Sequence, residues 1–238
     1  MNRIRLDRTR RTGAFATVLL GLLLCGIGCG PHDNPLHVAA RAGSLGDLQR
    51  AYDSGADVNG VNESHRTPLM EAAKADNVQG AAFLVDHGAK LEATDEDRDT
   101  PLHYSARFGA APVARVLLDH GAIREVRNRD GATPLMLAAN YGWLDVLNVL
   151  LEAHVAVDPA DREGYTPLMR AAEDGYLKVV QALVENGARL DAANGRGETA
   201  VSLAAKARHK PVVDYLTEHT PKPPATAPAA TGSGAISP

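Results

Sequence analysis

The sequence predicts an all-α solenoid of stacked helix-turn-helix units. Its main indication is a motif that recurs at one fixed spacing, as Thr67-Pro68-Leu69, Thr100-Pro101-Leu102, Thr133-Pro134-Leu135 and Thr166-Pro167-Leu168. Thr199-Ala200-Val201 follows at the same spacing, and Asn34-Pro35-Leu36-His37 lies one period before the first. A fixed period of this size is typical of repeats that cannot bury their apolar faces alone and therefore stack.

Each part of the unit has a physical reason. The threonine can cap a helix N-terminus, and proline at the first helical position loses no hydrogen bond that the helix needs. The leucine and the alanines that follow give a short inner helix a small-residue face for close packing. Gly109, Gly142 and Gly175 lie where this helix must stop in a left-handed conformation.

The second helix of each unit supplies most of the predicted core. Apolar residues recur at helical spacing within 113–118, 146–151 and 179–184. Single units depart from the pattern without changing the prediction. Asp76 and Arg208 replace the glycine that ends the inner helix, and His154 replaces the glycine that ends the outer helix.

The unit resembles the ankyrin repeat. The match runs through Thr100-Pro101-Leu102-His103, Ala106, Gly109, the apolar run 116–118 and Gly121-Ala122. It covers residues 34–220, with repeats that begin near residues 34, 67, 100, 133, 166 and 199 and with cap-like first and last units. The resemblance implies that polar stretches such as 128–131 and 161–164 form β-hairpin-like fingers. It also implies a protein that binds another protein without catalysis.

Charge and cysteine content narrow the function class. The first eleven residues carry a net charge of +4, against −4 for the whole chain, which leaves −8 for the remainder. An acidic remainder disfavours nucleic acid as a partner. Cys25 and Cys29 both precede the repeats, so no disulfide or thiolate metal site can form within them. Residues 221–238 are rich in Pro, Ala, Thr, Gly and Ser and are predicted to be a disordered tail.

The N-terminal segment predicts export. Arg10-Arg11 precede an apolar, uncharged run, which is typical of a signal peptide over residues 1–28. Gly26-Ile27-Gly28-Cys29 resembles a bacterial lipobox, although Gly26 stands where leucine is usual. Cys29 is therefore the predicted lipidation site, and residues 29–33 form a short tether to the periplasmic side of a membrane. The outer membrane is favoured over the inner. An uncleaved membrane anchor is the alternative, because about 20 uncharged residues suffice to span a bilayer.

No catalytic, metal or cofactor site is predicted. His37 and His103 share one repeat position, and His87 and His120 share another. Stacked helices lie about 8–10 Å apart, so equivalent side chains are too distant to hold one ion. The acidic run 95–99 resembles a calcium loop in composition but lacks the central glycine and the distal glutamate. We expect a solvated finger turn there.

The exposed face of the inner helix, together with the finger tips, is the predicted partner surface. Positions two and six after the motif leucine lie on one helical stripe, and they carry Tyr104 and Phe108 in the third unit and Leu137 and Tyr141 in the fourth. Tyr165 lies in the finger before the fifth unit, and the finger residues Arg129 and Arg162 are candidates for steering a partner. Exposed aromatic residues with a polar rim are typical of binding hot spots.

Packing between repeats is the alternative role for these side chains. It competes equally for Tyr104 and Leu137, whereas partner contact is favoured for Phe108, Tyr141 and Tyr165. Trp143 and Tyr176 are predicted instead to pack in the turn between the two helices.

The leading functional interpretation is a lipid-anchored, monomeric adaptor or stabiliser of an envelope protein. An immunity-type inhibitor of a membrane-acting toxin and a structural envelope spacer are the two alternatives. A spacer would have no bound partner, and an inhibitor would have a toxin gene beside its own.

Overall fold

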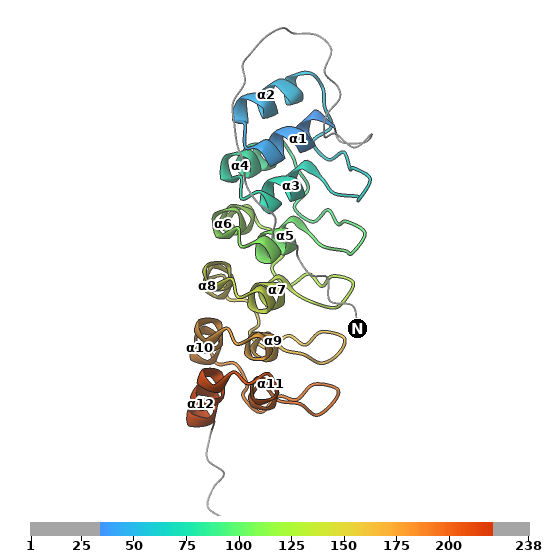
Figure 1. Cartoon of the computed structure of the whole chain (residues 1–238). Coiled ribbons are helices and arrows are strands. Elements are labelled where there is room, and N and C mark those ends of the chain that lie inside the picture. The colour runs from blue at the N-terminus through green and yellow to red at the C-terminus, as the bar shows by residue number, and fades with distance from the viewer. Residues whose placement is uncertain (1–33, 221–238) are drawn as a thin grey trace, which may run out of the picture.

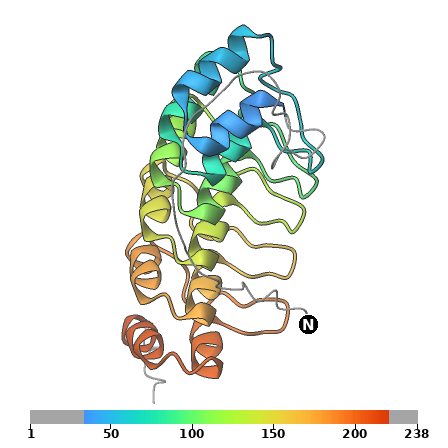
Figure 2. The ribbon, with the colours of Figure 1, turned by 45° about the horizontal axis from the view of Figure 1, so that its top comes forward.

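The computed structural model describes residues 34–220, which form a single stack of helix pairs (Figure 1). The helices are α1 (Pro35–Ala42), α2 (Leu45–Asp53), α3 (Pro68–Lys74), α4 (Val78–Asp86), α5 (Pro101–Phe108), α6 (Ala111–Asp119), α7 (Pro134–Tyr141), α8 (Leu144–Glu152), α9 (Pro167–Asp174), α10 (Leu177–Glu185), α11 (Ala200–Lys206) and α12 (Lys210–His219). The odd-numbered inner helices form one column, the even-numbered outer helices form a second, and the fingers project on a third side (Figures 1 and 2). The predicted all-α solenoid is confirmed.

The inner helices begin as the motif predicts. Asn34 and the five repeat threonines are the N-cap residues, each with an extended backbone and a side-chain oxygen that accepts from a backbone N–H in the first turn. Proline occupies the first helical position in every inner helix except α11. Because its missing N–H has no partner in a first turn, the motif starts a helix at no cost in hydrogen bonds.

Left-handed residues end the inner helices. Gly109, Gly142 and Gly175 have φ between 74° and 79°, and Asp76 (φ 52°) and Arg208 (φ 64°) take the same conformation at the equivalent positions. The outer-helix position behaves similarly at His154, whose φ is 57°. These three side chains therefore sit in a region of backbone space that favours glycine.

The core runs along the seam between the two columns. The motif leucines from Leu36 to Leu168 are at most 2% exposed, and the small residues that follow them, alanine pairs or Ser105-Ala106, are at most 3% exposed. Leu84, Leu117, Leu150, Leu183 and Leu216 hold one position in successive outer helices and are fully buried. Each inner helix packs on the inner helices before and after it, and each outer helix does the same. Fully burying a leucine is worth about 1.5–3 kcal/mol, so stacking supplies the stability that no disulfide provides.

The fingers share one turn. Asn62, Asp95, Asn128, Asp161 and Asn194 each accept, through a side-chain oxygen, from the backbone N–H groups two and four residues later. The acidic run 95–99 is one of these turns, but Asp99 is buried, where it pairs with Arg107 and accepts from Asn128, and so is not solvated as expected. Backbone bonds then tie finger to finger, with Arg129 N donating to Asp97 O (2.8 Å) and Arg162 N donating to Asp130 O (3.2 Å).

Candidate binding surface

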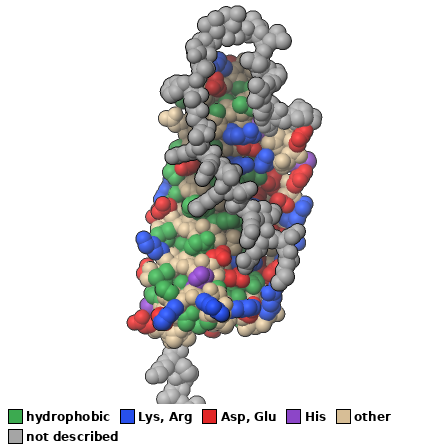
Figure 3. Space-filling model, viewed as in Figure 1, with side chains coloured by type: hydrophobic (Ala, Val, Ile, Leu, Met, Phe, Trp, Pro, Cys, Tyr) green, Lys and Arg blue, Asp and Glu red, His purple; other side chains and the backbone are tan. Residues whose placement is uncertain are grey.

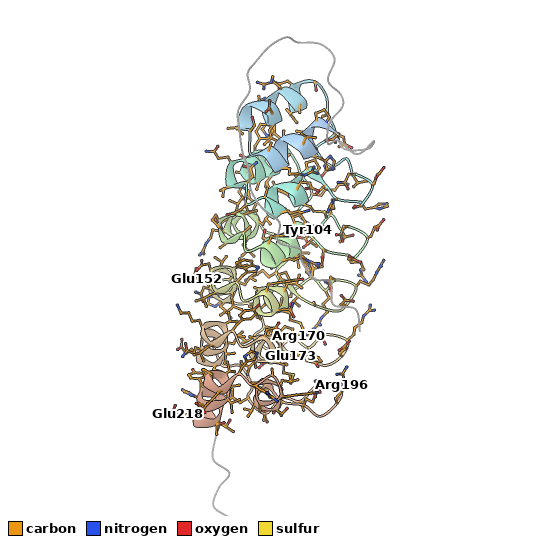
Figure 4. The ribbon with its side chains drawn as sticks, viewed as in Figure 1. Tyr104, Glu152, Arg170, Glu173, Arg196 and Glu218 are labelled. Carbon is orange, nitrogen blue, oxygen red and sulfur yellow. The ribbon has the colours of Figure 1, made fainter. Side chains whose placement is uncertain are left out.

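Two of the predicted partner residues lie in the interior. Tyr104 is 7% exposed, and its hydroxyl donates to Asp95 Oδ2 at 2.7 Å (Figure 4). Burial and this hydrogen bond raise the pKa of Tyr104. Leu137, at the equivalent position of the next repeat, is 9% exposed and belongs to the core. Because both side chains are buried, packing, the alternative role, holds for Tyr104 and Leu137 in place of partner contact.

The expectation that Tyr165 is an exposed finger aromatic is wrong. Its side chain is 4% exposed, and the guanidinium of Arg170 lies 3.8 Å from the centre of its ring. Arg170 is held there by Asp161, whose Oδ2 accepts from Arg170 Nη2 at 2.6 Å. The Tyr165 ring is therefore buried at the base of its finger. The Arg170 guanidinium covers the ring and lies closer to solvent.

Phe108 and Tyr141 are exposed as predicted, each at 42%. They are the last residues of α5 and α7, and they precede the left-handed glycines that end these helices. The ring of Phe108 stacks on Tyr104 at 6.0 Å, and Lys74 Nζ lies 5.6 Å from its centre. One face of Phe108 is thereby held against the repeat while part of the ring remains in solvent.

Trp143 and Tyr176 extend this surface. Packing in a turn between helices was predicted for both, but each ring packs on the glycine turn of the preceding repeat: a Cβ on Gly109 would lie 2.7 Å from the Trp143 ring, and one on Gly142 would lie 2.6 Å from Tyr176. Trp143 Nε1 also donates to Arg107 O at 2.9 Å. Even so, Trp143 is 43% exposed and Tyr176 is 37% exposed. This exposure was not predicted, although the two rings hold the same position in successive repeats, which was a signal for it.

We call Phe108, Tyr141, Trp143 and Tyr176 the aromatic strip. They come from three consecutive repeats and make up four of the ten aromatic residues of the whole chain. The face shown in Figure 3 carries hydrophobic side chains over the repeats of α7 to α10. Because the Trp143 and Tyr176 rings pack on glycine turns, these two rings present apolar area at a low entropic cost of binding.

Charged side chains occupy the repeats before the strip and its last repeat. On the N-terminal side, Arg41 Nε and Arg66 Nε each lie 3.0 Å from an oxygen of Glu71, a carboxylate that is fully buried rather than exposed. On the C-terminal side, Arg170 Nη1 lies 3.9 Å from Glu173 Oε2 (Figure 4). Burial, with a smaller effect of the Asp174 carboxylate, raises the pKa of Tyr176. Lys74 at Phe108 and Asp174 near Tyr176 are the charged groups that lie directly beside the strip.

The two finger arginines differ in their surroundings. Arg129 is exposed, and its Nη1 lies 3.6 Å from Asp97 Oδ1, so part of its charge is balanced by the preceding finger. Arg162 is also exposed, at the tip of the next finger. Both remain accessible to a partner that reaches the fingers.

The histidines of the motif have structural partners. His37 Nε2 bonds to Arg66 O at 2.7 Å, and His103 Nε2 bonds to Ala132 O at 3.2 Å, so each ties a helix to the next finger. Burial lowers the pKa of His103 to about 4, with a smaller contribution from the charge of Arg107. His87 and His120 bond to carbonyls of their own helices. Within residues 34–220, no three His, Cys, Asp or Glu side chains come together as a metal site.

A comparison with protein families decides the assignment. The model for ankyrin repeats in three copies matches residues 15–95, 36–127, 90–161, 122–194 and 145–227 in overlapping windows. The chain belongs to the ankyrin-repeat family. Ankyrin repeats are a scaffold for protein–protein interaction, and this family is in general noncatalytic. A comparison with curated proteins gave no match.

The N-terminal predictions fall outside the part of the chain that the structure describes. The signal peptide, the lipidated Cys29 and the tether all lie before residue 34, and the predicted disordered tail lies after residue 220. Among the helices of residues 34–220, none is both long and apolar enough to cross a bilayer.

Proposed function

We propose that this ankyrin-repeat protein binds one envelope protein through the aromatic strip and acts as its adaptor or stabiliser. The strip supports this proposal because four large aromatic rings from three consecutive repeats each remain more than a third exposed. Such an apolar cluster is unfavourable in water unless a partner covers it. Aromatic side chains at the centre of a polar rim are where interface energy is usually concentrated.

Site-specific crosslinking in intact envelopes tests this proposal. A photoreactive amino acid at Tyr141 is expected to capture a single protein, because a partner seated on the strip must approach this side chain. The same amino acid at Tyr52, which is 36% exposed on the outer helix α2, is the matched control and should capture nothing specific. Equal products from both positions, or none from either, would favour a spacer without a partner.

The proposed location is the periplasmic side of a bacterial membrane, with the outer membrane favoured. It rests on the basic N-terminus, the apolar run that follows and the lipobox-like Gly26-Ile27-Gly28-Cys29. Four residues, 30–33, separate Cys29 from the first repeat and reach at most about 14 Å. A lipid on Cys29 would therefore hold the first repeat close to the membrane. We also propose that the anchored chain is monomeric and that protein is its only macromolecular partner.

Cys29→Ala is expected to abolish lipid attachment and leave an uncleaved precursor, because the thiol at this position is the acceptor of the lipid. Metabolic labelling with a radioactive fatty acid measures attachment, and gel mobility measures cleavage. Cys25→Ala is the control and should be labelled normally. Labelling that survives in Cys29→Ala, or that disappears only in Cys25→Ala, contradicts the lipoprotein assignment.

A further inference from the structure

The inner helices of the first three repeats carry a basic side chain at one shared position. Arg41, Lys74 and Arg107 lie 33 residues apart in the last turns of α1, α3 and α5, and we call them the basic row. The same position is Asn140 in the fourth repeat and Glu173 in the fifth. The basic row therefore stops at the repeat in which the aromatic strip begins.

The carboxylates that pair with arginines of this region are buried, whereas the arginines reach solvent. Glu71 is 0% exposed and lies 3.0 Å from Arg41 Nε and from Arg66 Nε, and these two side chains are 43% and 25% exposed. Asp99 is 2% exposed and pairs with Arg107, which is 30% exposed. Solvent therefore meets the cations of these pairs and not the anions.

Lys74 lies at the centre of the row and has no acidic partner. It is exposed, and within residues 34–220 no carboxylate forms an ion pair with it. Its Nζ lies 5.6 Å from the centre of the Phe108 ring. The carboxylate of Asp95 is committed elsewhere, since Oδ2 accepts from the Tyr104 hydroxyl and Oδ1 accepts from two backbone N–H groups of its own turn.

The domain around this row is acidic. Residues 34–220 contain 19 basic and 27 acidic side chains, a net charge of −8. Such a charge repels surfaces that are anionic throughout, such as a layer of acidic lipid headgroups or a nucleic acid. A short acidic segment within a protein can instead reach the row without bringing a large negative surface against the rest of the domain.

We propose that the partner binds through a segment that places a carboxylate on Lys74 and an apolar side chain on Phe108. This inference rests on the proposed function and specifies the chemistry of the partner. The separation of 5.6 Å corresponds to about two residues of extended chain, so the acidic and apolar residues lie close together in the partner sequence. Opposite charge at one edge of an apolar contact fixes the register in which the segment binds.

Carbodiimide coupling in intact envelopes tests this proposal, because it joins an amine to a carboxylate only where the two are in contact. The full chain should be coupled through Lys74 to the protein that a photoreactive amino acid at Tyr141 captures. Mass spectrometry of the digested product should place the other end of the link on an Asp or Glu within about three residues of an apolar residue.

Two arginine variants control the coupling. Lys74→Arg keeps the charge but has no amine that couples, so the coupling product should disappear while the Tyr141 photoproduct remains. Lys178→Arg, at an exposed position of the outer helix α10, is the matched control and should retain both products.

Charge reversal measures the electrostatic part of the contact. Lys74→Glu should slow association with the purified partner about tenfold at low salt, and the difference should shrink as salt is added. Lys178→Glu makes the same change in net charge away from the row and should have a much smaller effect.

The outcomes separate this proposal from the adaptor function. A Tyr141 photoproduct without a coupling product that depends on Lys74 would overturn the acidic segment and leave the adaptor function standing. Absence of both products would remove the adaptor function and this inference with it. Binding to phosphatidylglycerol vesicles that depends on Lys74, without the coupling product, would assign the basic row to a lipid surface instead.

Discussion

Replacing Phe108 and Tyr141 together by alanine is expected to weaken capture of the partner at least tenfold. Truncating a central aromatic residue of an interface typically costs about 2 kcal/mol or more, and each ring belongs to a surface that is pinned to the repeat below it. The double variant should still fold, because both rings are 42% exposed and the core lies beneath them. The protein identified by crosslinking is purified and titrated into each variant to measure the affinity. Circular dichroism measures thermal unfolding.

Tyr52→Ala is the matched control for this experiment. It removes an aromatic ring of similar exposure, which packs against Phe83 and His87 on the outer column and lies outside the strip. Its affinity for the partner should equal that of the unchanged chain. Trp143 is the only tryptophan in the sequence and lies on the strip, so its fluorescence reports binding without a label. Unfolding of the double variant, with binding retained in its folded fraction, would make Phe108 and Tyr141 core residues and refute the site.

The fold could be predicted from the sequence because the same residues that begin and end helices recur in every repeat. Threonine at the N-cap, proline at the first helical position and glycine at the end of the helix recur at one period. A substitution at one of these positions in a single repeat therefore does not alter the architecture. The predictions held even where the motif changes. Asp76, His154 and Arg208 keep the positive φ of the glycines they replace. Neighbouring repeats impose that conformation, since the stack fixes the direction in which each helix must end.

The binding surface was harder to predict, because the repeat period alone does not show whether an aromatic ring is buried by its neighbours or exposed to solvent. Tyr104 and Phe108 lie on one stripe of one helix, yet the first is buried and the second is exposed. Tyr165 is covered by the Arg170 side chain, a contact between a finger and the following helix that helical spacing does not reveal. Conversely, Trp143 and Tyr176 each pack on the glycine turn of the preceding repeat, but a large ring lying on glycine is too big for the turn to cover.

The largest expected effect on folding is a pH dependence that belongs to His103. Its pKa is lowered to about 4 by burial, against about 6.5 in an unfolded chain. The unfolded chain therefore binds the proton more readily between these values. The contribution of His103 to stability is fully present above pH 6.5 and falls as the pH is lowered towards 4. Linkage gives a loss of about 2 to 3 kcal/mol in the free energy of unfolding between pH 7.5 and pH 4.5.

His103→Met isolates this effect, because methionine already occupies the equivalent position at Met70, Met136 and Met169. The variant loses the bond to Ala132 O at every pH, so the informative quantity is the change in its unfolding free energy between pH 7.5 and pH 4.5. This change should be smaller than that of the unchanged chain by about 2 to 3 kcal/mol. Urea unfolding at both pH values measures it. Burial raises the pKa of Asp99, and this carboxyl is present in both proteins, so its opposing contribution cancels in the comparison.

The reciprocal change Met136→His should introduce a similar dependence in the fourth repeat. Equal pH dependence in the unchanged chain and His103→Met would mean that His103 takes up its proton in the folded stack as easily as in water, and that its bond to the next finger survives the charge.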